Sequence, residues 1–238
     1  MAGHSKWANI KHRKGKADQK KGKIFSRCAK EIISAVKLGG PDPKSNPRLR
    51  LAIQKAKEVN VPNEIVDRNI KKASSTDQAD FTEMTYELYG HGGVGIIAEV
   101  MTDNKNRISS DMRIATNKRG GTVATPGAVS FNFDRKGVIE ILKKEVNEDE
   151  LFMAATEAGA EDFATDDEEL FTIITDPLNL YTVKEALQKS GYAIEEDSIQ
   201  MIPKTKVEVD EETAKSNLAL IEWLENLDDV DAVYHNMA

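Results

Sequence analysis

The chain lacks the features of secreted, membrane-spanning and disulfide-stabilised proteins. Its 238 residues include one cysteine, Cys28, so no disulfide can form within the chain, and this usage is typical of a reducing compartment. No run of about 18 apolar residues is present. The N-terminus also lacks the apolar stretch and small-residue cleavage site of a secretory signal. The sequence therefore predicts a cytoplasmic protein that does not cross a membrane.

A large apolar face is also missing from the cation-rich N-terminus. Residues 1–23 are dominated by lysine, and Trp7 and Ile10 are the only large apolar residues after Met1. An organelle transit peptide would instead be amphipathic and rich in arginine and serine. The same shortage of apolar side chains disfavours insertion into an anionic membrane surface.

Local signatures of catalysis and of metal binding are absent as well. There is no GxxxxGK[ST] loop, HExxH helix or GxSxG elbow, and the four histidines do not have the spacing of metal ligands. Runs of carboxylates, such as residues 166–169, are most simply solvated loops and helix starts. The sequence predicts a protein that is not an enzyme, with no metal, no cofactor and no small-molecule substrate.

One glycine motif has the letters of a dinucleotide-binding loop, because Gly90, Gly92 and Gly95 match GxGxxG. That fingerprint opens a helix, whose N-terminal amides hold the pyrophosphate. Here residues 96–100 (IIAEV) follow, and they predict a strand. We interpret the motif as a glycine-rich turn between two strands; an anion-binding nest of backbone amides is the alternative.

The strongest positive signal is a separation of charge along the chain. Residues 1–76 carry 19 Lys or Arg and 6 Asp or Glu, whereas residues 77–238 carry 14 and 34. Ten of the cations lie in the first 30 residues, where Asp18 is the only acid. A basic end on an acidic body is typical of a protein that approaches a polyanion through that end.

Apolar periodicity predicts an α+β fold that begins with a three-helix bundle. Residues 24–36 repeat at helical spacing, Asn46 before Pro47 caps a second helix, and Pro62 opens a third. After residue 80 the pattern alternates between strands and helices. Strands are expected at 85–89, 95–101, 162–164, 170–175, 198–202, 206–209 and 231–235, helices at 108–117, 148–158, 180–189 and 211–226, and a hairpin at 129–141 with its turn at 134–136.

The acidic half is expected to contain two small α+β domains of the split βαβ, ferredoxin-like type. Three helix-to-strand connections in this half resemble one another. Because the closing helix and strand of the first α+β domain come only at the C-terminus, the second is inserted into it. The expected parts are a basic arm at 1–23, the helical bundle at 24–76, an α+β domain at 77–133 plus 207–238, and the inserted domain at 134–206.

The basic residues point to nucleic-acid binding. Lys and Arg neutralise phosphates, and the rings of Trp7 and His12 can stack on unpaired bases. The charge continues into the bundle, which disfavours a merely solvated tail. A second basic group at residues 105–119 offers a further contact; a solvated helix face is its alternative interpretation. The candidate nucleic-acid-binding residues are Lys6, Trp7, Lys11, His12, Arg13, Lys14, Lys16, Lys20, Lys21, Lys23, Arg27, Arg48, Arg50, Lys55, Lys105, Arg107, Arg113, Lys118 and Arg119.

Several motifs resemble the YebC/PmpR family, and the resemblance covers essentially the whole chain. They are residues 1–14 (MAGHSKWANIKHRK), 22–25 (GKIF), 40–43 (GPDP), 46–50 (NPRLR), 89–93 (YGHGG) and 102–107 (TDNKNR). The resemblance implies a helical bundle followed by two α+β domains, and a regulator of transcription that binds promoter DNA. Relatives, including a mitochondrial translational activator of cytochrome oxidase, are linked to the ribosome and to relief of stalling at proline-rich stretches. The resemblance therefore leaves promoter DNA and ribosomal RNA both open as partners, and it implies no catalytic residue.

Overall fold

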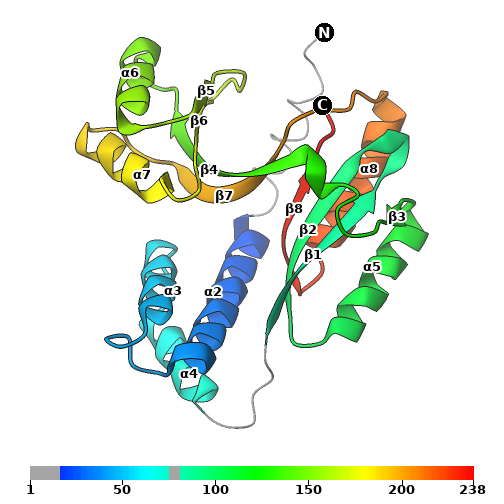
Figure 1. The fold of residues 1–238 in the computed structure, drawn as a ribbon, viewed down its shortest axis with the longest axis horizontal. Coiled ribbons are helices and arrows are strands. Elements are labelled where there is room, and N and C mark those ends of the chain that lie inside the picture. Colours follow the sequence, from blue (N-terminus) through cyan, green and yellow to red (C-terminus); the bar gives the residue numbers. More distant parts are fainter. Residues whose placement is uncertain (1–16, 75–80) are drawn as a thin grey trace. The chain divides into compact units, whose positions relative to one another are not determined.

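The computed structural model describes residues 17–74 and 81–238, with side chains from residue 22 onward (Figure 1). The chain forms two compact units. The first comprises the chain up to Ala128 together with Val207–Ala238, and the second is Val129–Lys206. Among the helices of the described ranges, none is long and apolar enough to cross a membrane.

Three helices near the N-terminus form a small bundle in the first unit. They are α2 (Ala17–Gly39), α3 (Pro47–Glu58) and α4 (Asn63–Ala73); the three helices were predicted, but α2 begins seven residues earlier, within the expected arm. Asn46 explains the sharp connection between α2 and α3: its Oδ1 accepts from the Leu49 amide at 3.0 Å, and its Nδ2 donates to the Ala35 carbonyl at 2.8 Å. A Cβ at Gly39 would lie 2.7 Å from the Asn46 side chain, so the stop signal of α2 is also a packing requirement.

The same unit contains a four-stranded antiparallel sheet in the order β3-β1-β2-β8. Its strands are β1 (Thr82–Tyr89), β2 (Gly95–Thr102), β3 (Thr122–Val123) and β8 (Val230–His235), and its helices are α5 (Lys105–Arg119) and α8 (Glu211–Glu225). Side chains of β2 and of both helices, including Ile96, Met112 and Leu220, meet in one buried core. The helices therefore cover the same face of this sheet.

The glycine motif connects β1 to β2. It forms a short 3-10 turn, His91–Gly93, in which Gly92 has a φ of 67°, a region that favours glycine. The Gly90 amide donates to the Val94 carbonyl at 2.7 Å, which closes the turn. The motif leads into a strand, so the prediction of a glycine-rich turn is confirmed.

The second unit is a split βαβ domain whose four antiparallel strands have the order β5-β6-β4-β7. Its elements are β4 (Phe133–Leu142), α6 (Glu148–Ala158), β5 (Asp162–Ala164), β6 (Leu170–Thr175), α7 (Leu180–Lys189) and β7 (Glu196–Pro203). Helices α6 and α7 lie side by side (Figure 1), and Leu151 and Val183 pack with Ile139 of β4 in the core. The α+β class and the ferredoxin-like type are as predicted.

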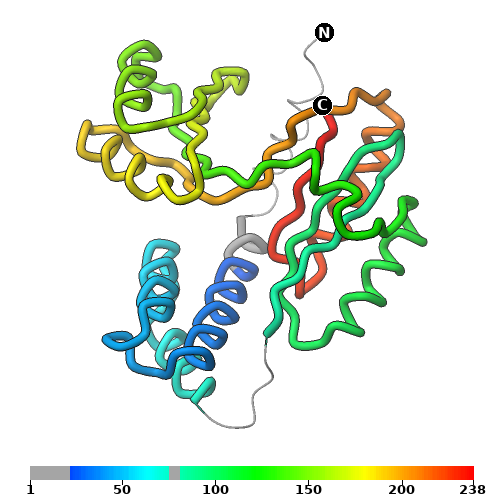
Figure 2. The backbone as a smooth tube through the Cα atoms, in the orientation of Figure 1, coloured from blue at the N-terminus to red at the C-terminus, as the bar shows by residue number. Residues whose placement is uncertain are grey.

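The two ends of the second unit run next to each other (Figure 2). The Lys204 amide donates to the Asn132 carbonyl at 2.8 Å, and the Thr205 amide donates to Asn132 Oδ1 at 3.0 Å. Because the two ends of the inserted domain lie close together, its insertion requires little distortion of the domain that contains it.

The predicted hairpin at 129–141 is wrong. Strand β4 runs unbroken through Asp134, Arg135 and Lys136, which pair with residues 200–202 of β7. Asp134 is a residue type that turns favour, but the three residues include no glycine or asparagine for the positive φ angles of a tight hairpin turn. The expected first strand at 129–133 is mostly a 3-10 turn, Ser130–Asn132.

Two other short elements also differ from the prediction. The strand expected at 206–209 is only an isolated bridge between Val207 and Met237. Strand β3, with two residues that pair with Leu88 and Tyr89, was not expected at all. Both elements are fixed by pairing with distant parts of the chain, which a local pattern does not report.

Candidate nucleic-acid interface

The structure describes the side chains of ten of the candidate residues, five in the bundle and five on α5. Lys20 and Lys21 lie in α2 ahead of the side chains that are described. The candidates outside the described residues are Lys6, Trp7, Lys11, His12, Arg13, Lys14 and Lys16.

The candidate cations of α2 contact groups of their own unit. Lys23 Nζ donates to the Leu227 carbonyl at 3.1 Å, and Arg27 forms an ion pair with Glu31 at 3.5 Å. Burial lowers the pKa of Arg27, but the nearby Asp231 and Glu31 carboxylates more than compensate, and the net pKa is raised. Lys23 is therefore held by a backbone carbonyl, and the charge of Arg27 is partly neutralised by acids of its own unit.

A buried ionic network centred on Asp229 links α2 to the α+β part of the first unit. The side chain of Lys30 enters from α2, and its Nζ donates to the carbonyls of Met101 and Asp228, each at 2.9 Å. The same Nζ lies 3.6 Å from Asp229 Oδ1. Lys30 and Asp229 are 9% and 5% exposed, so neither charge is free for an external partner.

The other oxygen of Asp229 engages a candidate residue of α5. Asp229 Oδ2 accepts from Arg107 Nη2 at 2.6 Å and Nε at 3.1 Å, and from the Thr102 hydroxyl at 2.9 Å. Arg107 Nη2 also donates to Asp103 at 2.7 Å. Hydrogen bonds to Asp229 first, and then to Asp103, raise the pKa of Arg107. Arg107 therefore has a structural role, which the sequence did not indicate because Arg107 lies among other basic residues.

The three candidate residues on α3 are exposed and weakly paired. Arg48 lies 2.9 Å from Glu83, Lys55 lies 3.8 Å from Glu31, and Arg50 donates to the Pro43 carbonyl at 3.1 Å. Exposed pairs of this kind contribute about 0–1 kcal/mol, so a phosphate can replace the carboxylate at little cost. Other exposed cations of α3 and α4 are Lys57, Arg68, Lys71 and Lys72.

The five candidates on α5 do not form one uniform surface. Arg107 is held by Asp103 and Asp229, as above. The Arg119 guanidinium lies over the indole of Trp223, with its central carbon 5.2 Å from the ring centroid. All five are exposed, and the other three are Lys105, Arg113 and Lys118.

The glycine-rich turn is anchored by a buried amide that the sequence analysis did not single out. Asn217 is fully buried; its Oδ1 accepts from the His91 amide at 2.7 Å and its Nδ2 donates to the His91 carbonyl at 3.0 Å. A Cβ at Gly90 would collide with this side chain. Because the His91 amide already has a partner, an anion nest at this turn would lack one of its donors.

The His91 ring connects the turn to α5. Its Nε2 lies 2.8 Å from the Arg119 carbonyl, and because a carbonyl only accepts, Nε2 carries the proton in this contact. A Cβ at Gly120 would collide with the same ring. Among the described residues, no group of three His, Cys, Asp or Glu side chains is arranged to hold a metal ion.

Two family models match the chain. Residues 5–76 match the TACO1/YebC protein N-terminal domain, and residues 81–237 match the TACO1/YebC second and third domain. The two matches leave residues 77–80 between them.

Similar proteins cover the chain from end to end. A protein of Protochlamydia amoebophila named as a probable transcriptional regulatory protein is 75% identical over 237 residues, which are 100% of this chain and 96% of the relative. One of the same description from Chlamydia trachomatis serovar L2 is 61% identical over all of both chains. The crystal structure of a conserved hypothetical protein from Aquifex aeolicus has a TM-score of 0.82 and 46% identity, over 96% of this chain and 95% of that one.

Proposed function

Because the chain belongs to the TACO1/YebC family, whose members include probable transcriptional regulatory proteins, we propose that it is a non-enzymatic, cytoplasmic regulator that binds promoter DNA. One observation carries the proposal. The exposed cations of α3 and α4 continue the charge of the basic N-terminal residues, and their carboxylate partners are weakly held. A polyanion gains its affinity from cations of this kind.

The acidic part of the chain limits where DNA can bind. Residues 77–238 hold 34 acids and 14 cations, so they repel phosphates overall. The bundle and the arm, with 19 cations and 6 acids, are the attractive part. We therefore assign the contact to the candidate residues of the arm together with Arg48, Arg50 and Lys55.

Salt dependence of duplex binding tests the proposal. If about six phosphates are contacted, the logarithm of affinity falls with the logarithm of salt concentration at a slope of about −5. Replacing Arg48, Arg50 and Lys55 by glutamine should make the slope shallower by about 3. A matched control replaces three exposed lysines of the second unit, Lys144, Lys189 and Lys204. A flat salt response, or an equal effect of the control, contradicts the proposal.

Sequence recognition requires a separate measurement. A regulator that reads bases should prefer its promoter fragment over a scrambled duplex by at least about a thousandfold. Equal affinity for the two duplexes would leave phosphate binding intact and refute base readout.

A ribosome-associated translation factor that binds RNA is the second candidate. Trp7 and His12 among the cations of the arm favour it, because aromatic rings stack on unpaired bases of single-stranded RNA. It predicts that the protein travels with ribosomes in a low-salt sucrose gradient and that deletion of residues 1–23 releases it. A protein that stays at the top of the gradient while ribosomes sediment excludes this candidate.

A further inference from the structure

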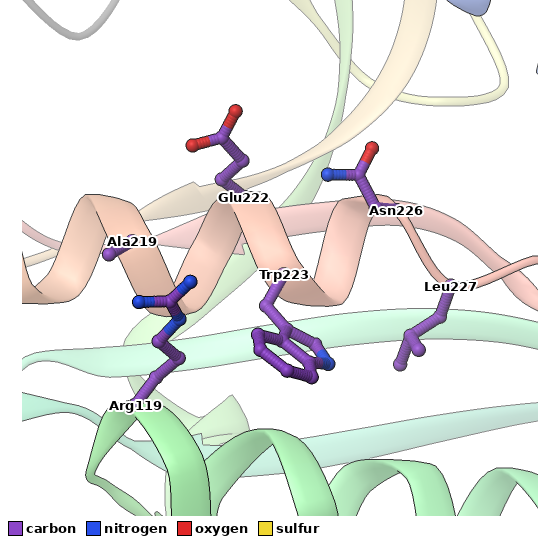
Figure 3. Close-up of a pocket in the computed structure, with 6 residues that line it drawn as sticks. All are labelled: Arg119, Ala219, Glu222, Trp223, Asn226 and Leu227. Atoms are coloured by element: carbon purple, nitrogen blue, oxygen red, sulfur yellow. The ribbon is translucent and has the colours of Figure 1, made fainter.

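The C-terminal ends of α5 and α8 border a cleft of about 320 Å³ in the first unit (Figure 3). Arg119 extends from the end of α5 toward α8, and the indole of Trp223 extends from α8 toward α5. Leu227 lies beyond the indole, while Glu222 and Asn226 point to the other side of α8. The residues that line the cleft are Arg119, Ala219, Glu222, Trp223, Asn226 and Leu227.

The backbone of Arg119 and the indole of Trp223 are held in place by neighbouring groups of the same unit. Arg119 follows the buried Met112 and Ala115 at helical spacing, so it emerges from the core-facing side of α5 next to α8. Its carbonyl is fixed by His91 Nε2. Trp223 lies beside the fully buried Leu224 and packs against the same core. The indole is therefore held against the core, and the exposed guanidinium lies over it.

We propose that this cleft binds a single unpaired nucleobase, stacked on Trp223 and covered by the Arg119 guanidinium. The proposal rests on the nucleic-acid binding proposed above and names a second contact for it. Aromatic rings and guanidinium planes are the groups on which proteins stack unpaired bases. The volume lies at the lower end of the range for small-ligand sites, which suits one base and is far too small for a duplex.

The charges around the cleft favour a base over a phosphate. The acidic Glu222 is among the residues that line it. Phosphates that flank the stacked base can instead meet the exposed cations of α5, among them Arg113 and Lys118. The guanidinium carbon of Arg119 lies 5.2 Å from the centroid of the Trp223 ring, which is too close for a base to stack between them. A base that stacks on Trp223 therefore displaces the guanidinium, and Arg119 then covers the other face of the base.

Trp223 fluorescence tests the proposal directly, because the chain has two tryptophans and Trp7→Phe leaves Trp223 alone. In full-length Trp7→Phe protein, a single-stranded adenine hexamer should quench this fluorescence. An abasic hexamer of the same phosphate count should bind without quenching it. Binding itself is followed by anisotropy of the labelled hexamers. Quenching by the abasic strand as well, or no quenching when anisotropy shows saturation, overturns the proposal.

Substitutions separate stacking from charge. Trp223→Ala should weaken hexamer binding about tenfold to a hundredfold, the range for one base–aromatic stack, while Trp223→Phe, which keeps a ring, should lose far less. Arg119→Lys keeps the charge but lacks the plane, so it should lose nearly as much affinity as Arg119→Ala. The matched control Arg113→Ala removes an exposed cation from the same helix; it should lower the salt slope by about 0.7 and weaken the adenine and abasic hexamers equally.

The remaining outcomes distinguish this site from the proposed function. If Arg119→Lys binds the hexamer like the unsubstituted protein, the residue is a phosphate contact and the stacking proposal fails. If duplex binding keeps its salt dependence while Trp223 never responds, the cleft proposal fails and the regulator proposal stands. If the hexamer quenches Trp223 while duplex DNA shows no salt-dependent binding, the cleft proposal stands and the duplex proposal fails.

Discussion

Replacement of Asp229 by alanine is expected to be strongly destabilising. This carboxylate is 5% exposed and receives hydrogen bonds from Thr102 and Arg107 on one oxygen, with Lys30 Nζ 3.6 Å from the other. Truncation would leave the Lys30 ammonium buried next to the carbonyls of Met101 and Asp228 and 6.0 Å from the centroid of the Phe81 ring, without its carboxylate. The perturbation therefore creates an uncompensated buried charge as well as removing bonds.

The expected cost is about 3–5 kcal/mol, the range for breaking a buried ion pair by removing one partner. Arg107 contributes little to this cost, because its side chain is 47% exposed and water can replace the carboxylate. The neighbouring Asp228 provides a matched control. Its side chain is exposed and Lys30 uses only its backbone carbonyl, so Asp228→Ala should change stability by no more than about 0.5 kcal/mol.

Urea unfolding followed by circular dichroism measures the free energies, and hydrogen exchange of the α2 amides reports whether the linkage to α2 is lost. A cost for Asp229→Ala within about 1 kcal/mol of that for Asp228→Ala would refute the reasoning. The charge argument has a second test, because Lys30→Met removes the buried ammonium. If the two residues are coupled, the double variant should be less destabilised than the sum of the single variants by about 0.5–3 kcal/mol.

Three further predictions follow from the same structure. Asn217→Ala leaves the His91 amide and carbonyl without their buried partner and should cost about 1–3 kcal/mol in thermal unfolding; a neutral effect would contradict the anchoring role. Asn46→Ala should lose about 1–2 kcal/mol of capping, whereas Asn46→Asp keeps the acceptor for Leu49 and should lose less. Burial raises the pKa of Asp231 above its ordinary 3.8, although Arg27 opposes this. The stabilisation linked to its proton is therefore present below that value and lost as the pH rises through the raised pKa. Relative to Asp231→Asn, the unsubstituted protein should lose stability over this interval in urea titrations, and an opposite slope would contradict the assignment.

Much of the fold could be predicted because local signals agreed with the tertiary structure. Helix α6 has its predicted bounds: Asn147 Oδ1 caps it by accepting from the Glu150 amide, and Gly159 ends it in the left-handed conformation at a φ of 94°. Strands β5 and β6 and helix α7 also have their predicted bounds. Caps, glycines and apolar spacing act within a few residues, so the sequence displays them directly.

The roles of individual cations could not be predicted in the same way. Lys30 and Arg107 lie 199 and 122 positions from Asp229 in the sequence, and their contacts with it depend on the tertiary fold. A basic run looks the same whether its members face solvent or a buried carboxylate. One local signal of a buried carboxylate is present at Asp229, because this acid directly precedes the apolar Val230 that opens β8.

This difference changes how the charge of the basic half should be counted. The 19 cations of residues 1–76 suggest a very steep salt dependence, but Lys23, Arg27 and Lys30 are engaged by groups of their own unit. Breaking these contacts costs more than replacing the weakly held partners of the exposed Arg48, Arg50 and Lys55, so the three engaged cations add less to counterion release than those of α3. The salt slope should therefore follow the exposed side chains of α3, α4 and the arm. For the same reason Lys30→Met should change stability while leaving the slope of duplex binding unaltered.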